Sequence, residues 1–227
     1  MTTTKAKHGT NLLSDGMANK KIRKTIQINR AHIVTFSLPA VVTCPSADKC
    51  LIGGYCTAGN YKYPSNEKKQ LDNYTASQSS EFVDMICAEL SEKWTYSKYV
   101  RIHPTGDFYN VHYLKKWVEI AVKNPDIIFY AYTKSIRIVK GYADKYGLPS
   151  NLIITYSFGS KDDILINPDK DRYAVVIGPN DECPAGYVNG SLDDLVMVKG
   201  AQKIALNYHH PNIKWEKSGF YGMTCPQ

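Results

Sequence analysis

The sequence contains no apolar run of about 18 residues, the length that an α-helix needs to cross a bilayer. Its first eight residues, Met-Thr-Thr-Thr-Lys-Ala-Lys-His, also lack the apolar segment of a secretory signal peptide. We therefore expect a cytoplasmic protein with no membrane partner. Because the cytoplasm is reducing, cysteines there favour metal or redox chemistry over a disulfide scaffold.

Several catalytic signatures are absent as well. The sequence has no Walker loop, no G-x-G-x-x-G turn, no H-E-x-x-H pair and no G-x-S-x-G elbow. Nucleotide hydrolysis and serine-hydrolase chemistry therefore have no support in the sequence.

What the sequence does contain is a cluster of cysteines. Cys44, Cys50 and Cys56, half of the six cysteines, lie in a glycine-rich segment that follows the apolar run from Ile33 to Leu38. Thiolates on a flexible loop can converge on one metal ion or iron–sulfur cluster. The spacing Cys-x5-Cys-x5-Cys matches neither zinc ribbons nor bacterial ferredoxins, so buried thiols or a disulfide remain alternatives.

Three cysteines leave one tetrahedral position of a metal site without a protein ligand. Cys183, in the segment Glu182-Cys183-Pro184, is our candidate, with Cys225, a histidine or an exogenous ligand as alternatives. A structural zinc site of four cysteines, or of three cysteines and a histidine, has the same donor chemistry and stays open.

The pattern beyond residue 30 alternates strand-like and helix-like segments, which is typical of a parallel sheet with helical crossovers. Helices are expected from Ser80 to Lys93, with Cys87 in the core, after Asn110 and after Ser135, while the C-terminal part is irregular. The six expected strands are the short apolar or aromatic segments His32–Ser37, Tyr99–His103, Ile127–Tyr132, Leu152–Tyr156, Tyr173–Ile177 and Lys203–Tyr208.

The domain organisation follows from length and charge. We expect one α/β domain over residues 30–227, preceded by a basic, mobile arm over residues 1–29. The net charge of +7, to which this arm contributes much, suits contact with nucleic acid or another polyanion, although a solvated leader explains it too.

Polar residues follow several of these strands, at the edge where parallel strands carry their chemistry. We expect them to face the same edge as the cysteine loop and to bind a substrate or cofactor, with no catalytic role assigned. They are His103, Gly106, Asp107, Thr133, Lys134 and Ser157. Asp107 could instead be a turn or cap residue, His103 could bond to the backbone, and Lys134 could be solvated.

These motifs carry a resemblance to known families. A cysteine-rich loop after the first strand and Gly106-Asp107 after the second resemble the first half of a radical S-adenosylmethionine (SAM) barrel. More closely, the sequence is similar to the bacteriophage gene product eighty-eight family, in the segments Phe36-Ser-Leu-Pro39, Cys44-Pro45, Gly106-Asp-Phe108 and Tyr132-Thr-Lys-Ser135. In place of the Gly-Gly-Glu turn of radical SAM enzymes this chain has Thr105-Gly106-Asp107, and its cysteines are more widely spaced.

The resemblance implies a single-domain, partial (β/α)6 TIM-like barrel and a [4Fe–4S] cluster held by Cys44, Cys50 and Cys56. It further implies a phage protein in the host cytoplasm that binds SAM or a small substrate at an open iron. Whether the protein is an enzyme of this kind is left open. The alternative is a non-catalytic protein, stabilised by an iron–sulfur cluster or zinc, that binds host nucleic acid or a host protein.

Overall fold

Short apolar and aromatic segments form the strands of a parallel sheet, as their composition predicts. The computed structural model describes residues 11–48, 56 and 64–208. All six predicted strands are confirmed, with each end within one residue of its expected place. They are β2 (Ile33–Phe36), β3 (Tyr99–Ile102), β4 (Ile128–Thr133), β5 (Leu152–Ser157), β6 (Tyr173–Ile177) and β8 (Lys203–Asn207).

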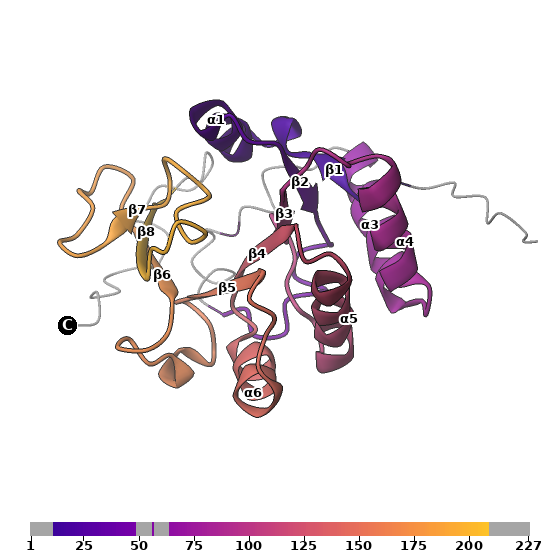
Figure 1. Ribbon diagram of the computed structural model, residues 1–227. Coiled ribbons are helices and arrows are strands. Elements are labelled where there is room, and N and C mark those ends of the chain that lie inside the picture. The colour runs from indigo at the N-terminus through magenta and orange to yellow at the C-terminus, as the bar shows by residue number, and fades with distance from the viewer. Residues whose placement is uncertain (1–10, 49–55, 57–63, 209–227) are drawn as a thin grey trace, which may run out of the picture.

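The described residues form a mixed α/β structure around one sheet of eight strands (Figure 1). The order is β1-β2-β3-β4-β5-β6-β8-β7, so the strands from β2 to β6 are neighbours in sequence order and run parallel. β1 (Ser14–Asp15) adds an antiparallel edge and β7 (Val188–Asn189) pairs with β8. These two strands were not predicted, because two residues are too few to show a period.

Helices cover one face of the sheet. α4 (Phe82–Glu92), α5 (Val111–Lys123) and α6 (Ile136–Tyr146) lie where they were predicted, and Asn110 caps α5 by accepting a hydrogen bond from the Tyr113 amide. α3 (Pro64–Gln78) is a further helix that the sequence analysis did not identify. The main core lies between this layer and the sheet and includes Phe36, Phe82, Trp117 and Phe129.

Residues 11–29 differ from the expected mobile arm, whereas residues 1–10 lie outside the described part. Lys20–Asn29 form helix α1, whose Ile22 and Thr25 are buried. Ile22 packs in a second apolar cluster with Ile33, Tyr130 and Met197, on the sheet face away from α4, α5 and α6. The helix forms because Asn19 caps it and because Ile22 and Ile26, one turn apart, pack on the same side.

The later crossovers are irregular, as expected. Between β5 and β6 there is one short 3-10 helix (Asp163–Leu165), and the segment from Gly178 to Leu192 contains only the two-residue β7 among named elements. None of the helices in the described ranges is both long and apolar enough to cross a bilayer.

Candidate ligand site at the carboxyl edge of the sheet

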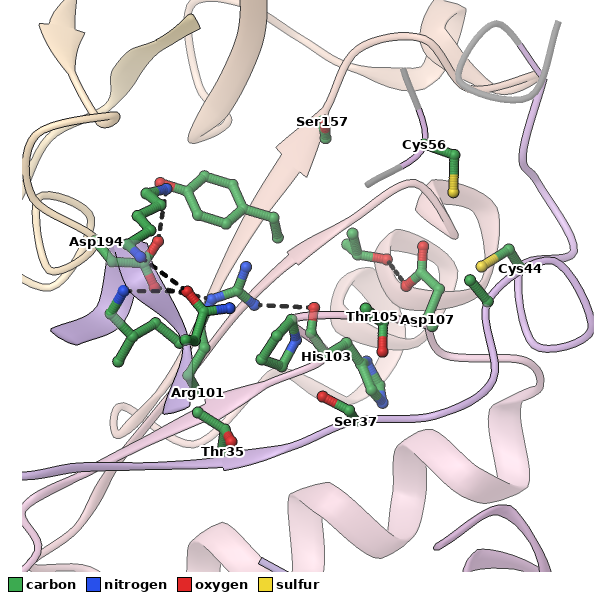
Figure 2. A pocket seen from close by; sticks show the side chains of 18 of the residues that line it. Thr35, Ser37, Cys44, Cys56, Arg101, His103, Thr105, Asp107, Ser157 and Asp194 are labelled. Atoms are coloured by element: carbon green, nitrogen blue, oxygen red, sulfur yellow. Dashed lines mark hydrogen bonds and ion pairs between the residues drawn. The ribbon is translucent and has the colours of Figure 1, made fainter. Parts of the chain in front are cut away.

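A cavity of about 500 Å³ opens at the carboxyl edge and along the sheet face opposite α5 and α6 (Figure 2). A volume of this size suits a small-molecule ligand. The cavity brings together eight of the predicted site residues, namely Cys44, Cys56, His103, Gly106, Asp107, Thr133, Lys134 and Ser157.

The cysteine loop reaches this cavity directly after β2. Cys44 and Cys56 both line it, and Figure 2 shows their sulfur atoms on the side of the pocket where the Asp107 carboxylate lies. Cys50, the third predicted ligand, lies outside the described residues. Within the described ranges, no three His, Cys, Asp or Glu side chains are grouped closely enough to hold a metal ion.

Backbone and side-chain contacts hold the beginning of this loop against the segment after β3. Leu38 N donates to Thr105 O over 3.0 Å, and Thr105 Oγ1 donates back to Leu38 O over 3.0 Å. Gly106 has φ +81°, and a Cβ there would lie 2.6 Å from Leu38 Cβ and 2.7 Å from Thr43 Oγ1. Glycine is therefore required for the two segments to pack, and this packing places Cys44 beside the residue that follows Gly106.

That residue, Asp107, is buried and accepts four hydrogen bonds. Oδ1 accepts from Thr133 Oγ1 (2.5 Å) and Phe108 N (2.7 Å), and Oδ2 accepts from Lys134 N (2.8 Å) and Ser135 N (3.2 Å). Burial raises the pKa of Asp107, while these hydrogen bonds act in the opposite direction. Because a carboxylate has about four acceptor positions, Asp107 is fully used in joining two strand-end segments.

Asp107 thereby also caps α6. The Ser135 side chain, the predicted cap, makes no capping hydrogen bond, and the carboxylate of Asp107 accepts the amides at the start of the helix instead. A negative charge at a helix N-terminus is stabilised by the helix dipole. The structure thus gives Asp107 hydrogen bonds at the start of α6, and its contact with a ligand stays a prediction.

A cation lies further along the same edge. Lys134 Nζ donates to Ser157 Oγ over 2.7 Å, which links the ends of β4 and β5. Both residues line the cavity, so an ammonium group lies at this edge of it.

His103 has an unusual backbone, with φ +58°, and its ring lies in the aromatic core. Nε2 is 2.8 Å from the hydroxyl oxygen of Tyr113. Burial, with a smaller contribution from the charge of Arg101, lowers the pKa of His103 well below its usual value. The imidazole is therefore neutral at physiological pH, which does not suit a group that must exchange protons with a ligand near pH 7.

Two other cysteines lie away from the cavity. Cys183, the predicted fourth ligand, is not among the cavity-lining residues; its thiol donates to Tyr187 O (3.3 Å) and packs against the main core. Cys87 also packs against the main core, as predicted, and accepts a hydrogen bond from Asn124. The structure thus does not bring Cys183 to the site of Cys44 and Cys56.

A charged cluster that no sequence motif indicated lies at the other end of the cavity. Asp194 Oδ1 pairs with Lys21 Nζ at 2.7 Å and Asp194 Oδ2 with Arg101 Nε at 3.0 Å. Burial alone would raise the pKa of Asp194, but the charges and hydrogen bonds of Lys21 and Arg101 outweigh it and lower that pKa to about 2. The available signal was Arg101 itself, a charged residue inside the otherwise apolar strand Tyr99-Val-Arg-Ile102.

Comparisons with known proteins bear on the identity of the chain. Neither the curated proteins nor the solved structures contain a significant match. The family model described as gene product 88 matches residues 5–218, which covers almost the whole sequence. The chain therefore belongs to the gene product 88 family, as its motifs predicted.

Proposed function

We propose that this protein is an iron–sulfur protein of the host-cell cytoplasm, in which Cys44, Cys50 and Cys56 hold a [4Fe–4S] cluster at the mouth of the cavity. In this proposal the parallel sheet is a partial (β/α)6 TIM-like barrel, and the cavity takes SAM or another small molecule. The observation that carries the proposal is that Cys44 and Cys56 line the same cavity as the strand-end residues Asp107 and Lys134.

The residues at the cavity mouth fit such a group. Thiolates are the usual ligands of iron–sulfur clusters, and two of the three cysteines reach one side of the cavity from a loop whose beginning is held by Thr105. Two residues after Cys44, Ser46 Oγ donates to Asp162 Oδ2 over 3.0 Å and fixes this part of the loop further. Three protein thiolates would leave one iron open, which supplies a Lewis-acid or redox position.

The chain's own residues would position the ligand. Lys134, held by Ser157, offers a cation to an anionic group of the ligand. Asp107 joins the segments that follow β3 and β4 through its hydrogen bonds, so it acts as a positioning residue. The neutral His103 supports the same edge through its ring contacts.

Metal analysis of anaerobically purified protein tests the proposal. We expect brown protein with iron, acid-labile sulfide and a broad thiolate-to-iron absorption band, and we expect Cys44→Ala or Cys56→Ala to remove most of the iron. Those variants should also be less stable, because metal binding is coupled to folding. Cys87→Ala is the matched control and should retain the cluster. Stoichiometric zinc without iron would favour the structural zinc alternative instead.

A titration with SAM then decides the cofactor. Millimolar SAM added to the reduced protein should change the electron paramagnetic resonance signal of the cluster if SAM binds the open iron. An unchanged signal would leave a different small molecule as the ligand.

A second candidate function rests on the exposed side of α1. Lys20, Arg23 and Lys24 are exposed there, and three cations on one helix suit contact with nucleic acid or an acidic surface of a host protein. Salt-dependent binding to nucleic acid by a protein that takes up no small ligand would favour this candidate.

A further inference from the structure

The charged cluster at the inner end of the cavity has more positive than negative charge. Lys21 and Arg101 are both paired with a single carboxylate, that of Asp194, whose low pKa keeps it ionised. Two cations and one anion leave a net charge of +1. Arg101 and Asp194 are buried, while the side chain of Lys21 is 32% exposed and reaches the cavity. An excess of positive charge beside a cavity attracts an anion, and the burial of Arg101 strengthens this attraction.

Two polar groups of this cluster have no hydrogen-bond partner among the described residues. Arg101 donates from Nε to Asp194 and from Nη1 to the carbonyl oxygens of Ile102 and His103. No hydrogen bond from Nη2 to a described residue is found, and Figure 2 shows one terminal nitrogen of the guanidinium pointing away from both partners. The hydroxyl of Tyr132 is buried and also has no hydrogen-bond partner in the described ranges.

The guanidinium is held in place before any ligand arrives. Its carbon lies 4.9 Å from the centroid of the Tyr132 ring and 5.7 Å from that of Tyr130, and Lys21 Nζ lies 5.3 Å from the Tyr132 ring centroid. Stacking of this kind fixes the orientation of an arginine, so less entropy is lost when it binds an anion.

Lys21, Arg101, Tyr132 and Asp194 all line the cavity that Cys44 and Cys56 reach from the other end. Figure 2 shows Asp194 and Arg101 on one side of this pocket, the two cysteines on the opposite side, and His103 between them. A molecule bound in the cavity can therefore contact both ends.

We propose that Lys21 and the Nη2 side of Arg101 form an anion subsite, which binds a carboxylate or phosphate group of the small molecule whose reacting end faces the cysteines. The inference rests on the proposed function in that it assigns a ligand class to the same cavity. It predicts an acidic small molecule, such as an organic acid or a phosphate ester, as the ligand.

Titration of the full-length protein with inorganic phosphate and, separately, with acetate tests the subsite by calorimetry at low ionic strength. We expect saturable binding of at least one of them, and the preferred anion identifies the ligand group. Lys21→Met should weaken that binding by about tenfold, because it removes a charge-assisted contact. This variant leaves Asp194 paired with Arg101, so it should fold.

Lys20→Met is the matched control, because it removes the same charge from the neighbouring residue of α1, which is exposed and does not line the cavity. Its affinity should equal that of the wild type. Arg101→Lys should weaken binding as Lys21→Met does. Equal effects of Lys20→Met and Lys21→Met would show surface binding and overturn the subsite, as would no saturable binding up to about 50 mM anion.

The same titration on Cys44→Ala separates this inference from the proposed function. Loss of iron with retained phosphate or acetate binding would leave the subsite standing whatever the metal proves to be. An iron-loaded wild type that binds neither anion would overturn the subsite and leave the cluster in place.

Discussion

At Gly106 the backbone conformation and the packing both require glycine. Its φ of +81° is costly for any residue with a Cβ, and the added atom would collide with Leu38 Cβ at 2.6 Å. Gly106→Ala should therefore lower the free energy of unfolding by about 2 to 4 kcal/mol, from backbone strain plus overpacking. Because Leu38 and Thr43 lead into the cysteine loop, the variant should also bind less metal. Urea unfolding and metal analysis measure the two effects.

Gly147→Ala is the control for this experiment. Gly147 has a similar φ of +73°, but nothing lies within 4 Å of the added Cβ. Its φ of 73° and ψ of 170° lie in a region that only glycine adopts readily, so the variant should lose about 1 to 3 kcal/mol from the backbone alone and retain its metal. If both variants lost the same free energy of unfolding, the close approach of Gly106 to Leu38 would not contribute to the effect of Gly106→Ala.

Asp194 should make the stability of the folded protein sensitive to acid. Its pKa in the folded protein is about 2, below its ordinary value of 3.8, so its stabilising contribution is complete above about pH 4 and is lost as the pH falls through the folded pKa. The contribution is roughly 2 kcal/mol. Asp194→Asn should be less stable than wild type at pH 7, and this difference should shrink between pH 4 and pH 2. Urea unfolding at several pH values measures it.

Asp126→Asn, at an exposed aspartate, serves as the comparison for the acid series. Its stability should follow that of the wild type at each pH. A constant difference between Asp194→Asn and wild type from pH 7 to pH 2 would contradict the assigned role of the carboxylate.

At the scale of elements, α1 is a docked helix. Thr25 Oγ1 accepts from the Asp194 amide over 2.8 Å, and Asn29 Nδ2 donates to Asp193 Oδ1 over 3.0 Å. Thr25→Val keeps the shape of the side chain but leaves the Asp194 N–H buried without a partner, which should cost about 1 to 3 kcal/mol. Hydrogen exchange should show protected amides in α1 of the wild type and faster exchange in the variant.

The exposed Thr75 of α3 provides the matching control, since Thr75→Val should leave exchange in α1 unchanged. Rapid exchange of α1 amides in the wild type would contradict a docked helix and support the mobile arm that the charge pattern predicted. The pattern misled because lysines on one side of a short helix conceal the few apolar residues, such as Ile22, that dock it.

For the whole molecule, the alternation of strand residues creates two different faces. On β4, Phe129 and Ala131 belong to the main core beneath the helices, while Tyr130 and Tyr132 lie on the other side with α1. That second face carries the cavity, because α1 and the segment around Leu195 cover only part of it. The cysteines and the charged cluster are thus two ends of one surface.

Short-range patterns in the sequence were sufficient to predict much of the fold and part of the site. The six central strands, three helices, the cysteine loop after β2 and the polar strand ends follow from apolar periodicity, caps and chain order, which act over a few residues. Family membership also follows from such short motifs.

Only the tertiary structure decided which distant residues share the site. Arg101 and Asp194 are 93 positions apart, and Lys21 comes from a segment expected to be a free arm. Cys183 was expected at the site from its position after β6, and the structure places its half-buried thiol beside Tyr187, against the main core. Such contacts depend on how loops and edge elements pack across the sheet, where buried charges need partners of opposite charge. The apolar periodicity of a single segment carries no information about these distant partners.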